Sequence, residues 1–222
     1  FSVAHNDEFT TIGAEAFMNS SLREVDLFDS VTTIGARAFA GCAQLEELTL
    51  PDSLTTIGEG ALDGLTGLKK LVIKCDPALI PAGVFANMPN LSEVTIESGA
   101  VPAHMFAGSG VKALTLGEGV TEIGESAFAD TLLSAADLKH VTAIGAGAFA
   151  NTAMTSVELP QAAAIGEGAF EGSALESVRL SAAASVGERA FANTKLKQLV
   201  IPTAGSFPLS AVEGTNPQLR LP

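Results

Sequence analysis

The side chains best suited to catalysis or metal binding are few and far apart in this sequence. They are His5, Cys42, Cys75, His104 and His140. Their spacing matches no HExxH, GxSxG, P-loop or Cys-x-x-Cys pattern. Carboxylates such as Glu46 and Glu47 are adjacent, so in an extended segment they point to opposite sides. We therefore expect no catalytic site, no metal and no cofactor.

A repeated pattern sets where these side chains can lie. The letters IGAEAF at 12–17 return as IGARAF at 34–39 and as IGESAF at 123–128. Aligned on its first residue, the pattern recurs every 21 to 23 residues, at Ile12, Ile34, Ile57, Ile80, Val101, Ile123, Ile144, Ile165, Val186 and Phe207. This period predicts about ten stacked units. The histidines fall in separate units and cannot converge on one site.

A second pattern, apolar at its first, fourth and sixth positions, follows each closing Phe or its equivalent. It occupies 22–27, 45–50, 68–73, 91–96, 111–116, 133–138, 154–159, 175–180 and 196–201. Its last two apolar residues are separated by one position, so both face the same side of an extended segment. The pattern predicts one short strand in every unit.

The first pattern predicts how the units stack, because a unit of about 22 residues cannot bury its own apolar stripe. Its Gly marks an abrupt corner, and its Ala keeps neighbouring units close. Its Phe points inward, and we expect one continuous ladder made of Phe17, Phe39, Phe85, Phe106, Phe128, Phe149, Phe170 and Phe191.

The two patterns together, as in AFAGCAQLEELTLPDSLTTIG at 38–58, closely resemble the BspA-like leucine-rich repeat proteins of bacterial and protist cell surfaces. The resemblance implies a non-catalytic role in adhesion to host matrix proteins such as fibronectin, or in coaggregation. We expect a single right-handed leucine-rich repeat solenoid over residues 1–222, mainly β. A parallel sheet would form one face, with short strands and single helical turns on the other.

Two units depart from the pattern in a correlated way. Pro81 and Pro102 replace the corner Gly, while Val84 and Met105 replace the Ala. Proline is tolerated at the start of a helical turn. These units are therefore either a neutral variant of the turn or a dedicated binding edge.

The two cysteines are predicted to be free thiols. Cys42 occupies a position held by Leu65 and Met88 in the other 23-residue units, which predicts a small buried hydrophobic side chain. Cys75 follows its strand at the opposite edge of the sheet, roughly 15 to 20 Å away. A disulfide requires α-carbons within about 7 Å.

The composition limits the partners. A net charge of −13 argues against nucleic acid and anionic membrane surfaces. No apolar run reaches the roughly 18 residues of a membrane span. The chain begins in mid-pattern and ends at NPQLRLP, where a further strand would form, so we interpret both ends as cut from a longer secreted or cell-surface protein. We expect a monomer.

The exposed strand positions define a candidate protein-binding face. It comprises Glu24, Asp26, Phe28, Glu47, Thr49, Lys70, Val72, Glu93, Thr95, Thr115, Asp137, Glu158 and Arg179. The chain has no Trp or Tyr, which argues against a carbohydrate ligand and removes the usual hot-spot residues. Phe28 is either an anchor for a partner or is packed against the neighbouring turn.

Two functions are compatible with this surface. The first is an interaction module that adheres to an extracellular protein through its sheet face. The second is a structural spacer that holds other domains away from the cell wall. An enzyme would need a concave pocket lined by several titrating groups, and a regular solenoid offers none.

Overall fold

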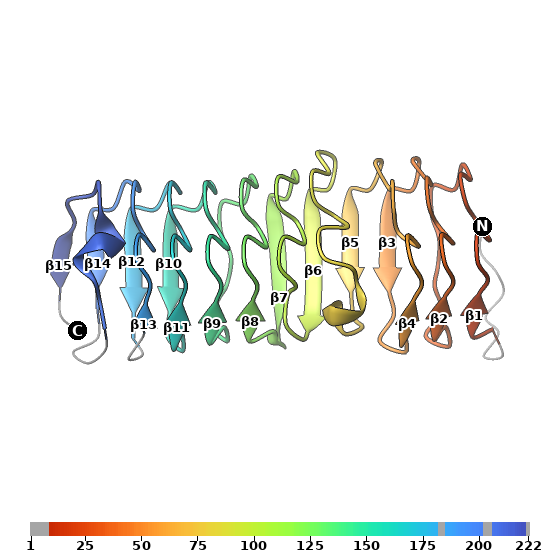
Figure 1. Ribbon diagram of the computed structural model, residues 1–222, viewed down its shortest axis with the longest axis horizontal. Helices are drawn as coiled ribbons and strands as arrows, with labels where there is room; N and C mark the ends of the chain where they lie inside the picture. Colours follow the sequence, from red (N-terminus) through yellow and green to blue (C-terminus); the bar gives the residue numbers. More distant parts are fainter. Residues whose placement is uncertain (1–8, 182–184, 202–205, 221–222) are drawn as a thin grey trace.

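The chain forms a row of stacked coils (Figure 1). The computed structural model describes residues 9–181, 185–201 and 206–220. Each regular coil contributes a short strand to the back face, then a turn segment to the turn face, then a longer strand to the front face. We number the coils from the one whose back-face strand contains Ile12. The predicted leucine-rich repeat solenoid with a parallel sheet is confirmed.

The front face carries two four-stranded parallel sheets. The first contains β3 (Glu47–Leu50), β5 (Lys70–Ile73), β6 (Glu93–Ser98) and β7 (Ala113–Gly119). The second contains β10 (Ser156–Leu159), β12 (Ser177–Leu180), β14 (Gln198–Val200) and β15 (Gln218–Arg220). The last of these is the further strand expected near the end of the sequence.

Two of the predicted front strands are wrong. Only Glu24 in 22–27 forms a bridge, to Glu47, and residues 133–138 form no strand at all. Like charges directly opposite each other weaken the first pairing. In the second segment Ala136 and Asp137 have low strand propensity, and the Asp137 carboxylate accepts a bond from the Lys139 backbone N–H instead (3.1 Å).

The back face carries the predicted short strands in two groups. The first group is β1 (Thr11–Ile12), β2 (Thr33–Ile34) and β4 (Thr56–Ile57). The second is β8 (Glu122–Ile123), β9 (Ala143–Ile144), β11 (Ala164–Ile165) and β13 (Ser185–Val186). Between the groups a 3₁₀ turn, η1 (Pro77–Leu79), takes the place of a strand in the fourth coil. A second 3₁₀ turn, η2 (Leu209–Val212), lies in the last coil.

The turn face does not contain the single helical turns that the sequence suggested. Its residues form successive tight turns in which every second N–H points to the next coil. In the first coil the amides of Glu15, Phe17 and Asn19 donate to carbonyls of the second coil at 2.8–2.9 Å. The second and sixth residues after the corner have positive φ, as at Glu15 (58°) and Asn19 (57°). The amides at the second, fourth and sixth positions thus join each regular coil to the next.

The core runs the length of the row, and most of its phenylalanines are fully buried. The rings from Phe85 to Phe191 stack in sequence, with centroids 5.2–5.9 Å apart. The predicted continuous ladder is wrong at one place. Leu62 occupies the Phe position of the third coil, so Phe17 and Phe39 form a separate pair at 5.3 Å.

Both cysteines are free thiols, as predicted, and both are buried, although burial was predicted only for Cys42. Cys42 lies in the core with Leu65 and Met88, and its thiol donates to the Phe17 carbonyl at 3.0 Å. Burial raises the pKa of the Cys75 thiol to about 11. The Cys75 thiol is therefore protonated at neutral pH and a poor nucleophile.

The corner glycines are required by the spacing between coils. A Cβ added at Gly58 would lie 2.4 Å from the backbone N of Ala36, and one at Gly166 would lie 2.5 Å from that of Ala146. Neither atom belongs to a side chain that could rotate away. The Gly therefore allows each coil to approach the preceding one closely, a reason that the sequence did not reveal.

Candidate binding surface

The first charged row of the candidate face is assembled as predicted. Glu47, Lys70 and Glu93 are direct neighbours on β3, β5 and β6, and Glu24 bridges to Glu47 from the first coil. All four side chains are exposed. The row continues through small residues beyond Glu93, beginning with Ala113.

The second row lies two positions further along each strand. Thr49, Val72, Thr95 and Thr115 are in register across the first sheet. Glu158 and Arg179 are opposite each other in the second sheet. Opposite charges on neighbouring strands favour pairing. The second row is therefore mostly neutral in the first sheet and charged in the second.

Two of the predicted residues outside the strands, Asp26 and Asp137, have different surroundings. Asp26 is exposed, in a coil that has only one bridge to its neighbour. Asp137 lies in the interruption between the two front sheets, where it is paired with Lys139 (3.0 Å). Its hydrogen bond to the Lys139 side chain lowers the pKa of the Asp137 carboxyl. The candidate face is thus two surfaces separated by the sixth coil.

Phe28 is half-buried. The neighbouring Leu27 belongs to the core, and the Phe28 carbonyl accepts a bond from the Val31 amide at 3.0 Å. Both interpretations of the Phe28 side chain therefore stay predictions.

A third charged row lies one residue before the first, and the sequence analysis missed it. Lys69 pairs with Glu46 at 2.8 Å, and Lys197 pairs with Glu176 at 2.8 Å. Their hydrogen bonds to lysine lower the pKa values of both glutamates. The second position of each apolar-x-x-apolar-x-apolar pattern would have identified this row, because it also lies outside the core.

A shallow hollow of about 300 Å³ opens beside the charged end of the front face. Arg23, Glu46 and Lys69 line it, together with Ala43, Gln44, Gly67 and Asn90. Arg23, Glu46 and Lys69 directly precede Glu24, Glu47 and Lys70 in the chain. The hollow therefore adds charges of both signs next to the start of the front strands.

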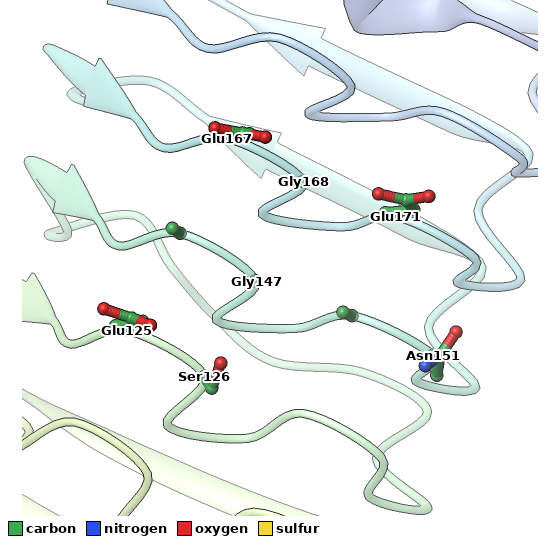
Figure 2. Close-up of a pocket in the computed structure, with 9 residues that line it drawn as sticks. Glu125, Ser126, Gly147, Asn151, Glu167, Gly168 and Glu171 are labelled. Carbon is green, nitrogen blue, oxygen red and sulfur yellow. The ribbon is translucent and has the colours of Figure 1, made fainter.

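The turn face has a hollow of about 380 Å³ at the sixth to eighth coils. Figure 2 shows Glu167 and Glu171 on either side of Gly168, with Glu125 and Asn151 at other edges of the hollow. Within the described residues no three His, Cys, Asp or Glu side chains are placed to hold a metal ion. His104 and His140 lie in different coils, and His5 is outside the described residues.

Glu171 has partners of its own on this face. Its carboxylate accepts hydrogen bonds from Arg189 and from the Asn193 amide (3.1 Å). The bond to Arg189 is the main reason why the pKa of Glu171 is lowered. Arg189 also pairs with Glu213 at 2.8 Å. These contacts join three successive coils and have a structural role.

No helix in the described part of the chain is long and apolar enough to cross a membrane. The described helical segments are short 3₁₀ turns.

Comparisons with known proteins support the repeat assignment. A model of the BspA type leucine rich repeat region matches residues 10–133 and 99–208, with six copies. No curated protein sequence matches the chain.

Two solved structures are similar to this chain at low sequence identity. A leucine rich cell surface protein from Faecalibacterium prausnitzii is 17% identical with a TM-score of 0.33, covering 99% of this chain and 85% of that protein. A leucine-rich repeat protein from Bacteroides ovatus is 18% identical with a TM-score of 0.40, covering 98% of this chain and 73% of that protein. Since the family model matches most of its length, the chain belongs to the BspA-type leucine-rich repeat family.

Proposed function

We propose that this chain is a non-catalytic protein-interaction module of a secreted or cell-surface bacterial protein, and that it adheres to host or bacterial proteins through its front face. Membership of a surface-associated repeat family supports the class of role. The ligand itself has to be found by experiment.

The observation that carries the proposal is the row of Glu24, Glu47, Lys70 and Glu93. No ion pair among the described residues joins Lys70 to Glu47 or Glu93, although the three are neighbours in the sheet. Their charges are therefore available to a partner. The adjoining hollow adds Arg23, Glu46 and Lys69, and the row itself presents three negative groups and one positive group. A partner surface with basic side chains around one acidic side chain would be complementary.

The test uses the substitutions Glu24→Lys, Glu47→Lys and Glu93→Lys in one protein. Binding is measured to immobilised fibronectin and to a panel of other matrix and bacterial-surface proteins. A matched control carries Glu125→Lys, Glu167→Lys and Glu188→Lys, which make the same change in net charge on the exposed turn face. We expect saturable binding that is lost only in the front-face variant.

Other outcomes would contradict the proposal. Equal losses in both variants would indicate a nonspecific effect of net charge. Loss in the control alone would move the binding surface to the turn face.

A structural spacer is the second candidate, because the described coils form one elongated row whose first and last coils lie at opposite ends (Figure 1). Absence of any retained ligand in the same screen would favour this function. The front face also lacks Trp and Tyr, the residues most enriched at binding hot spots together with Arg.

A further inference from the structure

The fourth coil differs from its neighbours at the corner. Other corners have Gly because a Cβ would collide with the backbone of the preceding coil, at 2.4 Å for Gly58 and 2.6 Å for Gly187. Pro81 occupies this corner in the fourth coil, Pro102 occupies it in the fifth and Pro208 in the tenth. A proline ring carries the Cβ for which the other corners have no room. This argues for a wider spacing before the fourth and fifth coils on this side, although the tenth coil, with Pro208, stays bonded to the ninth at Phe191 and Asn193.

The hydrogen bonds of the turn face match this expectation. Between the second and third coils, the amides of Arg37, Phe39 and Gly41 donate across at 2.8–2.9 Å. The corresponding amides of the third coil belong to Gly60, Leu62 and Gly64. Although residues 58–87 are fully described, no backbone hydrogen bond joins their turn segments.

The fourth and fifth coils are joined by part of the regular hydrogen-bond pattern. Between the fourth and fifth turn segments, which are also described throughout, one backbone bond is present, from Asn87 N–H to the Ala107 carbonyl at 2.8 Å. The fifth and sixth coils are again joined at three positions, beginning with His104 N–H to the Glu125 carbonyl at 2.8 Å. Complete loss of these bonds is thus confined to the interval before Pro81, because the ninth and tenth coils keep two of them, from the Phe191 and Asn193 amides.

The ring stack and the back-face pairing are interrupted at the same place, although the apolar core itself is continuous. Leu62 breaks the ring stack between Phe39 and Phe85, and the Phe85–Phe106 separation of 5.9 Å is the widest of the ring pairs. On the back face the first sheet ends at β4. Pairing resumes beyond η1 with the single bridge between Val101 and Ile123.

The front face alone passes through this region without a break. β5 and β6 are paired at four positions, from Lys70–Glu93 to Ile73–Ile96. Beneath them Leu71, Val94 and Ile96 are almost completely buried. Between the third and fourth coils, backbone pairing is therefore present on the front face and absent from the described turn and back faces.

We infer that the solenoid has a hinge at the fourth coil, with the β5–β6 pair as its axis. The first three coils and the coils from the fifth onward move as two bodies, and their motion opens and closes the turn face. Hinges are short segments that absorb a change in geometry between otherwise rigid parts. Bending here breaks none of the described turn-face bonds between the third and fourth coils, whereas bending in the regular coils would break three at each interval.

The test compares two pairs of spin labels that each span four coils on the turn face. Ala36→Cys with Glu125→Cys crosses the proposed hinge, and Ala103→Cys with Glu188→Cys lies beyond it. All four positions directly follow a corner residue. The parent protein is the labelling control, because its own thiols are buried.

Electron–electron resonance gives the distribution of distances within each pair. We expect the distribution across the hinge to be at least about twice as wide as that of the second pair. Equal widths would overturn the hinge.

A second experiment tests the cause. Pro81→Gly, Pro102→Gly and Leu62→Phe together restore the regular corner and the ring stack, and should narrow the first distribution to the width of the second. Pro160→Gly, at an exposed position after β10, is the control and should leave the width unchanged. Circular dichroism checks that each variant is folded. An unchanged width in the restored protein, or equal narrowing in the control, would contradict the role of the prolines.

Discussion

In the coils from the fifth to the ninth, three intercoil contacts hold each coil to the next: a ladder of turn-face amides, short back-face pairings and a stacked phenylalanine ring. Between the third and fourth coils none of the three is present among the described residues, and the front sheet carries the connection. In the sixth coil the opposite holds, because the front strand is missing while the turn face is complete.

This comparison shows that the front face can be lost while the turn and back faces are kept, and the reverse. A unit can lose one or two sides and remain in the stack, because the remaining bonds and the buried core still hold it. Position in the repeat, and not overall similarity to it, decides which contacts a substitution removes.

The largest expected effect comes from breaking the regular region at its core. Phe149→Ala should lower the free energy of unfolding by about 3 to 5 kcal/mol, because the ring stacks on Phe128 at 5.5 Å and on Phe170 at 5.3 Å. Urea unfolding followed by circular dichroism measures the change. A variant that melted within a degree or two of the parent would show that the ring stack contributes little.

A smaller effect is expected from a change that imitates the fourth coil. Gly166→Ala places a Cβ 2.5 Å from the Ala146 backbone N, whereas nothing lies within 4 Å of a Cβ at Gly13. We expect Gly166→Ala to cost about 1 to 3 kcal/mol, as overpacking does. Gly13→Ala, the matched control, should stay within about 0.5 kcal/mol of the parent.

Both Gly variants can be compared by thermal unfolding in parallel. If they lost the same stability, the cost would come from the backbone conformation of the corner, and close approach between coils would not explain the glycine.

The smallest effect concerns the ion pairs that join the eighth, ninth and tenth coils. The pKa of Glu171 is lowered in the folded protein, chiefly by its hydrogen bond to Arg189. A lowered folded-state pKa stabilises the protein above the ordinary carboxyl range. That contribution disappears as the pH falls through the lowered value.

Glu171→Gln should therefore reduce the melting temperature near neutral pH by at most about 2 °C, since the pair is partly exposed. The difference from the parent should vanish in acid. Glu167→Gln, on the same face and outside the described ion pairs, is the control. A difference between Glu171→Gln and the parent that grew in acid would contradict the assigned sign.

Much of this architecture was predictable because the strongest signals are local and repeated. The period, most front strands, the buried phenylalanines and the buried Cys42 follow from apolar spacing alone. The candidate rows are in register because that spacing is constant. The absence of regular strands at 22–27 and 133–138 could not be predicted from apolar positions. Strand pairing there depends on the residues that lie between the apolar positions. Glu24 lies opposite the like-charged Glu47, and Asp137 accepts a local hydrogen bond from the Lys139 amide.

The remaining errors concern relations between coils. Leu62 was visible in the sequence, but the break it makes depends on which rings become neighbours. The need for Gly at each corner arises from the preceding coil, about 22 residues earlier, and not from the turn itself. Pro81 and Pro102 are visible in the sequence as unusual residues. Their effect becomes apparent only from the short distance between a corner Cβ and the backbone of the preceding coil.

The continuous β5–β6 pairing also determines how the molecule would carry a mechanical load. A pull along the long axis is shared among several rows of bonds in the regular coils. At the fourth coil it passes through the front strands and the core beneath them. The turn face would separate there first, and the protein would lengthen by bending before any strand came apart.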